Sequence, residues 1–139
     1  SKVPALAFFI PLITAMGGNV GVQSSAIVVQ SLARGDAQLG SLWKKLGKES
    51  MVAIVNGLLL STIVYAITLF FGSSTLGLAV SVSLFTVTLF AAVFGTLIPL
   101  VLDRYKIDPA LATGPFITTL NDVLGLFIYF TIGMLFFGI

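Results

Sequence analysis

The residue whose type and position most clearly indicate a chemical role is Asp122, a single acidic residue within a long apolar segment. If the last helix begins at residue 109, Asp122 lies about 14 positions along it, roughly 20 Å from its start. An aspartate so deep in a membrane costs about 2.5–3.5 kcal/mol on insertion scales and normally faces other helices or water. We therefore predict that Asp122 faces the interior of a helix bundle, where a cation or a proton neutralises it.

The surroundings of Asp122 in the sequence favour a small, polar helix face. Steps of three or four residues connect Leu111, Gly114, Thr118, Asp122, Gly125 and Tyr129, most of which are small or polar. Asn121 and Thr119 flank the carboxylate. Pro115 has no backbone N–H, so the carbonyl of Leu111 is left free to turn toward a cavity.

A second group of small and polar residues lies near the N-terminal end of the chain. Gly17, Gly18 and Gly21 allow close helix packing, which is one interpretation of this group. Asn19 and Gln23 lie one helical turn apart on the same face, and their amides are costly in lipid. They also offer oxygen ligands or hydrogen bonds to water around an ion, which favours a pore-lining role.

The amino-acid composition indicates that these residues lie in membrane-spanning helices. The chain of 139 residues is 58% hydrophobic and 9% charged, with a mean hydropathy of +1.13. About 20 apolar residues cross a bilayer. We predict an all-α, polytopic transmembrane bundle that forms one ion-transport domain over residues 1–139. Its expected elements are helices at about 4–33, 51–71, 76–102 and 109–138, with an amphipathic cytoplasmic linker at about 34–50.

The first predicted helix is longer than the bilayer is thick, so a tilt, a kink or a local break is expected. Pro11 and the glycines at 17, 18 and 21 would loosen the helix and leave carbonyl groups for another partner. In lipid, such groups must face protein or a wet cavity.

The charges indicate topology and exclude several functions. Arginine and lysine are concentrated at 34–48 and 104–106, which places both loops in the cytoplasm by the positive-inside rule. The chain has no cysteine and no histidine, and it has no paired carboxylates within one span, so an enzyme is not expected. The net charge of +2 lies beside membrane spans and predicts contact with lipid rather than nucleic acid. A multi-pass protein of the plasma membrane is expected.

An oxygen-only site with one carboxylate suits a small, hard divalent cation. Mg²⁺ keeps several waters and needs only one or two carboxylates. If two copies meet on a two-fold axis, their Asp122 side chains supply two charges to one ion. Without the ion the two carboxylates would repel, and one would tend to bind a proton.

The residues resemble the MgtE family of magnesium transporters over essentially the whole chain. The first similarity is the run Pro11, Gly17, Gly18, Asn19, Gly21 and Gln23. The second comprises Asp108, Pro109, Ala110, Leu111, Gly114, Pro115, Thr119, Leu120, Asp122, Gly125, Leu126, Ile128 and Tyr129. The two runs lie in the expected order, about 90 residues apart by their numbering.

The resemblance implies a homodimer with a pore on its two-fold axis, in which Asp122 holds a hydrated Mg²⁺. It also implies that Gly114 and Thr118 lie at family metal-site positions, where some members carry Asn and Ala. Members of the family have five membrane helices after cytoplasmic regulatory domains, and this chain begins at what would be the second helix.

Three functions are consistent with these features. The favoured one is a divalent-cation pathway, with Mg²⁺ as the bound and transported ion. In addition to Asp122, its expected lining is Gly17, Gly18, Asn19, Gln23, Pro115 and Asn121. The second is a proton- or Na⁺-coupled carrier in which Asp122 titrates. The third is an assembly subunit whose polar groups only hold helices together.

Overall fold

In the computed structural model, residues 2–35 and 39–138 are described, and they form helices connected by short turns. Four of these helices are long and apolar enough to cross a membrane: α2 (Ile10–Ala33), α3 (Leu39–Phe70), α4 (Ser74–Arg104) and α5 (Pro115–Phe137). Two short helices complete the described part, α1 (Lys2–Ala7) and the 3₁₀ helix η1 (Pro109–Ala112). No strand occurs within the described residues, so the predicted all-α class is confirmed.

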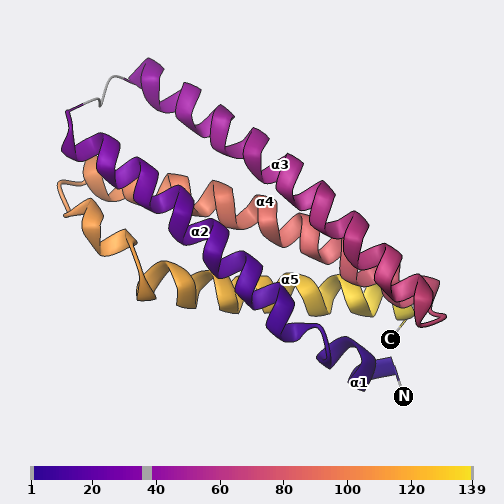
Figure 1. The fold of residues 1–139 in the computed structure, drawn as a ribbon. Helices are drawn as coiled ribbons and strands as arrows, with labels where there is room; N and C mark the ends of the chain where they lie inside the picture. Colours follow the sequence, from indigo (N-terminus) through magenta and orange to yellow (C-terminus); the bar gives the residue numbers. More distant parts are fainter. Residues whose placement is uncertain (1, 36–38, 139) are drawn as a thin grey trace.

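The helices run alternately up and down (Figure 1). Both termini lie at one end of the bundle, and the turns after α2 and α4 lie at the other end. The two loops rich in arginine and lysine are therefore on the same side, as the alternation of spans requires. The positive-inside rule assigns that side to the cytoplasm.

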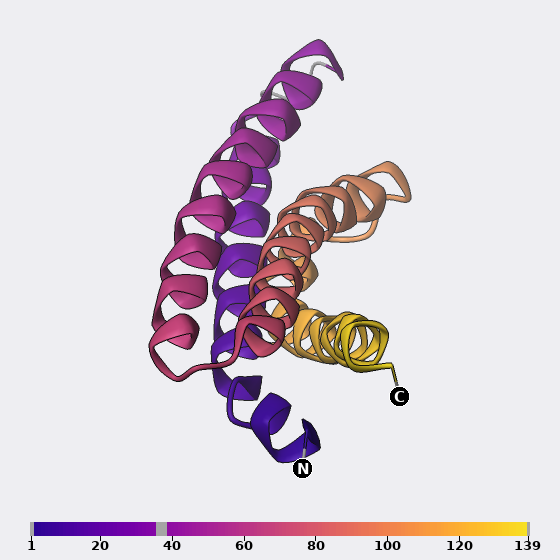
Figure 2. The same ribbon diagram turned by 90° about the vertical axis from the view of Figure 1, so that its right-hand side faces the viewer.

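Helix α4 is the centre of the bundle and packs against α2, α3 and α5 (Figure 2). Its buried face is rich in small residues, which let neighbouring backbones approach closely. These are Gly77, Ala79, Ser81, Ser83, Ala91, Ala92 and Gly95. The backbones of α4 and α2 approach closely, since a Cβ atom on Gly95 would lie 2.5 Å from the carbonyl oxygen of Gly21.

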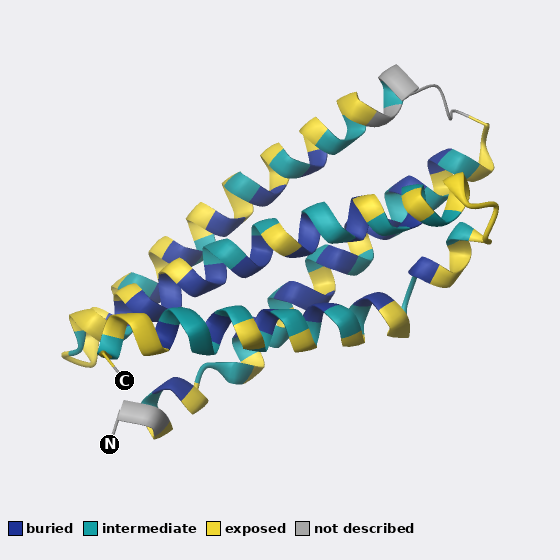
Figure 3. Cartoon of the chain, turned by 180° about the vertical axis from the view of Figure 1, so that it is seen from behind, coloured by how far each residue is buried: buried dark blue, intermediate teal, exposed yellow. Residues whose placement is uncertain are grey.

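The outer surface is apolar, as expected for helices in lipid. One face of α3 is exposed along its length (Figure 3), and Leu58, Leu59 and Ile63 are among its exposed residues. Many hydroxyl groups in the spans donate to a carbonyl of their own helix. Thr62, for example, donates to the carbonyl of Leu58 at 2.7 Å, and Thr88 donates to that of Leu84 at 2.7 Å. The hydroxyl of Ser61 donates to the carbonyl of Ser81 on α4.

The first predicted helix is divided in a different place from the one its composition suggested. The break lies at residues 8–9, between α1 and α2, and Pro11 occupies the first turn of α2. The expectation that Gly17, Gly18 and Gly21 loosen the helix is wrong, because α2 is continuous through all three. Proline fits the first helical turn, where its missing N–H has no intrahelical partner to lose.

The second long helix begins earlier than predicted. Instead of a separate linker at 34–50, the structure has one continuous helix from Leu39, and residues 36–38 lie outside the described part. Trp43 on this extension is 68% exposed, and Lys44 and Lys48 are also exposed. Their exposure agrees with an interfacial location, since lysine and tryptophan anchor helix ends at the headgroups.

The predicted helix at 109–138 is divided into η1 and α5. Asp108 caps η1 by accepting a hydrogen bond from the N–H of Ala110 at 3.0 Å. Gly114 then adopts φ +56° and ψ −128°, a conformation that favours glycine, and Pro115 begins α5. Because of this break, Asp122 is the eighth residue of α5, about 10 Å from its start rather than about 20 Å.

Tyr129 fastens the N-terminal segment to α5. Its side chain is fully buried, and its hydroxyl donates to the carbonyl of Leu6 at 2.7 Å. We expect Tyr129→Phe to lower the free energy of unfolding by about 0.5–1.5 kcal/mol, because the same carbonyl still accepts from the N–H of Phe9. Thermal unfolding in detergent would measure the change, and an unaltered midpoint would contradict this role.

Candidate functional site

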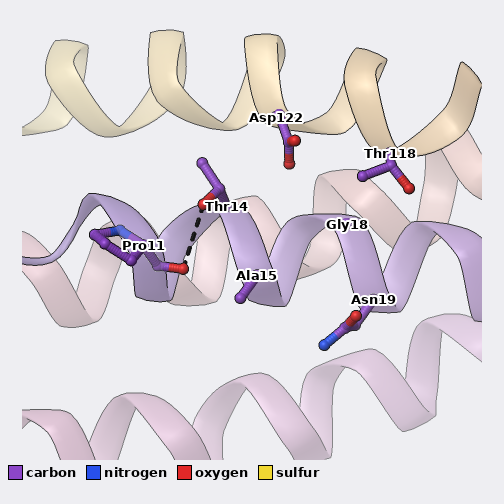
Figure 4. Close-up of a pocket in the computed structure, with 7 residues that line it drawn as sticks. All are labelled: Pro11, Thr14, Ala15, Gly18, Asn19, Thr118 and Asp122. Atoms are coloured by element: carbon purple, nitrogen blue, oxygen red, sulfur yellow. Dashed lines mark hydrogen bonds between the residues drawn. The ribbon is translucent and has the colours of Figure 1, made fainter. Parts of the chain in front are cut away.

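A cavity of about 260 Å³ lies between α2 and α5 and contains the Asp122 side chain (Figure 4). The other residues that line it are Pro11, Thr14, Ala15, Gly18, Asn19 and Thr118. Pro11, Ala15 and Asn19 are exposed in the single chain, so the cavity is open on that side. Its polar groups are one carboxylate, two hydroxyls and one amide, and none of them is a thiolate or imidazole.

Asp122 is half-buried and points from α5 into the space facing α2 (Figure 4). No described residue forms a hydrogen bond or an ion pair with its carboxylate. A permanent partner within the same chain, which would have made this aspartate purely structural, is therefore absent from residues 2–35 and 39–138. Such a carboxylate needs water, a cation or a proton to compensate for its charge.

Gly18 makes room for the carboxylate on the facing helix. A Cβ atom at this position would lie 3.6 Å from Oδ1 of Asp122 and 3.3 Å from Cγ2 of Thr118. The glycine thus brings the backbone of α2 next to both side chains. Thr118 donates its hydroxyl proton to the carbonyl of Gly114 at 3.1 Å, which leaves the lone pairs of its oxygen available to the cavity.

The remaining glycines of α2 lie in helix contacts. A Cβ atom on Gly17 would lie 3.1 Å from Val87 of α4, and one on Gly21 would collide with the side chain of Asn121. Asn121 itself is only 4% exposed, and its side-chain nitrogen has no hydrogen-bond partner. Neither Gly17 nor Asn121 is among the residues that line the cavity. The structure therefore places both at the junction of α2, α4 and α5.

The other predicted site residues are distributed around the cavity. Asn19 lines it, but its amide points away from α5 (Figure 4). Gln23, one turn further along α2, lines a separate cavity beside α3. Gly114 and Pro115 lie at the start of α5, and neither lines the cavity of Asp122.

Thr14 is a further site residue, one that was not predicted from the sequence. Its hydroxyl donates to the carbonyls of Ile10 and Pro11 at 3.1 and 3.3 Å, and it lines the cavity. The signal was present, since Thr14 precedes Gly18 by four residues and therefore shares its helix face.

These features define a polytopic helical membrane protein with a half-open polar site and one carboxylate between two spans. The chain belongs to the MgtE family of divalent cation transporters, whose sequence profile matches residues 10–132. The resemblance inferred from the two motifs is thereby confirmed.

Three relatives are similar over nearly the whole chain. The magnesium transporter MgtE of Bacillus subtilis is 38% identical over 136 residues, which is 97% of this chain. The magnesium transporters MgtE of Thermus thermophilus and Enterococcus faecalis are 37% and 35% identical, over 96% and 98% of this chain. The chain spans about 30% of the length of each relative.

Proposed function

We propose that this chain forms a membrane pathway for Mg²⁺, in which Asp122 binds the hydrated ion. The observation that carries the proposal is a carboxylate without a protein partner in a cavity of about 260 Å³. Six waters occupy roughly 180 Å³ at their liquid volume, so the space is large enough for an ion with its first hydration shell. The relatives bear the name of magnesium transporters, which supports the same cargo.

We further propose that two copies enclose the pathway. The cavity is open beside the exposed residues Pro11, Ala15 and Asn19 of α2. In lipid, an open side would leave the carboxylate next to hydrocarbon, which is costly. A second copy related by a two-fold axis covers both cavities and brings two Asp122 side chains to one divalent ion.

Flux measurements in liposomes test the proposed function. The reconstituted protein is expected to carry Mg²⁺ down its own gradient, at a rate that depends on the Mg²⁺ gradient and the membrane potential but not on a gradient of protons or Na⁺. A flux that requires an opposing gradient of protons or Na⁺ would instead establish the coupled carrier in which Asp122 titrates. Absence of Mg²⁺ flux under every gradient would leave only a structural role for the polar residues.

Narrowing the cavity should reduce flux without removing the carboxylate. Gly18→Val adds side-chain atoms next to Thr118 and Asp122, where a Cβ alone would already lie 3.3 Å from a methyl carbon. We expect Mg²⁺ flux to fall at least about tenfold, equivalent to about 1.4 kcal/mol, because the added methyl groups occupy space that the hydrated ion needs. The matched control is Gly47→Val on α3, where nothing lies within 4 Å of an added Cβ. Equal flux in both variants would contradict the position of the pathway.

A further inference from the structure

A second cavity with polar lining residues lies between α2 and α3, and its one carboxylate is that of Glu49. The side chain of Glu49 is 9% exposed, whereas Asp103 and Asp108 are exposed and Asp122 is half-buried. Glu49 is therefore the most buried acidic side chain among the described residues. A carboxylate removed from water to this extent requires a compensating charge or several hydrogen bonds.

The residues around Glu49 provide the ligand types that a hard cation prefers. Gln23 and Ser24 of α2 and Asn56 of α3 line the cavity together with the carboxylate, and the rest of the lining is apolar. The hydroxyl of Ser24 donates to Oε2 of Glu49 at 3.5 Å, which is long for a hydrogen bond to a carboxylate. Carboxylate, amide and hydroxyl oxygens are typical ligands of Mg²⁺ and Ca²⁺.

The size of this cavity differs greatly from that of the Asp122 site. Its volume is about 10 Å³, compared with about 260 Å³ around Asp122. A space of about 10–15 Å³ holds a single water-sized particle. An ion at Glu49 therefore contacts the carboxylate directly and gives up part of its hydration shell, whereas an ion at Asp122 keeps its waters.

Helix α2 connects the two cavities. Residues of α2 line both, together with Asp122 of α5 in one cavity and Glu49 of α3 in the other. Asn19 lines the Asp122 cavity and Gln23 lines the Glu49 cavity, and the two residues are about 6 Å apart along the helix axis. Both amides are exposed in the single chain. The Glu49 cavity lies nearer the end of the bundle that carries the basic loops.

We propose that Glu49, with Gln23 and Asn56, forms a second divalent-cation site on the cytoplasmic side of Asp122. The site binds a partly dehydrated ion through the Glu49 carboxylate. Its place along the ion pathway rests on the proposed function, but cation binding at Glu49 does not. The competing role for Glu49 is a structural ion pair with Lys45, one turn earlier on α3.

Mn²⁺ binding to the protein in lipid nanodiscs tests the site independently of transport. Mn²⁺ is the probe, because its electron paramagnetic resonance signal changes on binding and reports stoichiometry. In an Asp122→Asn background, addition of Glu49→Gln is expected to remove one further Mn²⁺ per chain. Unchanged stoichiometry on addition of Glu49→Gln, with the protein folded, would overturn the proposal.

Two further variants decide the outcome if Glu49→Gln fails to fold. Asn56→Ala keeps the carboxylate and is expected to weaken Mn²⁺ binding at this site at least fivefold. Lys45→Gln should leave binding equal or tighter, because it removes a nearby positive charge. If Asn56→Ala does not alter binding, or if Lys45→Gln abolishes it, the structural ion pair is the correct interpretation.

The same variants separate this site from the proposed transport function. In liposomes, Glu49→Gln is expected to raise the Mg²⁺ concentration for half-maximal flux at least threefold. Asp103→Asn, an exposed carboxylate at the end of α4, is the matched control and should alter neither binding nor flux. Normal Mg²⁺ flux with no Mn²⁺ bound at Glu49 would refute the second site and leave the role of Asp122 intact.

Discussion

Asp122→Asn is expected to reduce Mg²⁺ flux in liposomes at least 100-fold, equivalent to about 2.7 kcal/mol. The amide has nearly the same shape as the carboxylate, so the cavity and its lining remain. What is lost is the negative charge from each copy, and with it the main attraction for a divalent ion in a low-dielectric surrounding. Flux measured with a Mg²⁺-sensitive dye reports the effect directly.

Stability measurements distinguish loss of function from misfolding in this variant. No described residue is paired with Asp122, so neutralising it breaks no ion pair. Because a charged aspartate within a membrane is costly, Asp122→Asn should unfold in Mg²⁺-free detergent at the wild-type temperature or above it. Asp103→Asn, which removes an exposed carboxylate, should retain wild-type flux. Wild-type flux in Asp122→Asn would refute the proposed pathway.

The second large effect is expected at the crossing of α2 and α4. Gly95→Leu would force a side chain into a space where even its Cβ lies 2.5 Å from the carbonyl oxygen of Gly21. The obstacle is backbone, which has no alternative rotamer to relieve the clash. We expect the variant to lose its folded state in detergent, and Gly95→Ala to lower the free energy of unfolding by at least about 1–3 kcal/mol.

The matched control for this prediction is Gly47→Ala on α3. Nothing lies within 4 Å of a Cβ at that position, so the substitution adds no clash. Alanine favours a helix over glycine by about 0.5–1 kcal/mol, and the variant should therefore be slightly more stable. If Gly95→Ala unfolds at the same temperature as Gly47→Ala, the close crossing is not what holds α2 against α4.

The class of fold could be predicted from the amino-acid sequence, and the positive-inside rule predicts from the same sequence that both basic loops are cytoplasmic. Both follow from local properties, since a run of about 20 apolar residues forms a span wherever its neighbours are. Asp122 could also be predicted as a site residue, because a lone carboxylate in such an apolar run costs free energy and usually has a function. The motif pair that includes Pro11 and Pro115 was sufficient to indicate the family.

Which polar residues share a cavity depends on how the helices pack against one another. Neighbours in the sequence diverge by about 100° on a helix, so Asn121 packs against Gly21 of α2 while Asp122 faces the cavity. Gly17 and Gly18 separate in the same way, one against Val87 and the other against Asp122. Helix rotation is set by packing against several neighbours at once, and one chain segment does not encode it.

The helix breaks and the burial of Glu49 also depended on long-range contacts. Pro11 and Pro115 each fit the first turn of a helix, but the sequence around them does not show where the preceding helix ends. Contacts between distant segments contribute to that, such as the hydrogen bond that the hydroxyl of Tyr129 donates to the carbonyl of Leu6. Glu49 follows a run of lysines and reads as a surface residue in the sequence. It is buried because α2 packs beside it and brings Ser24 to its carboxylate, a contact between residues 25 positions apart.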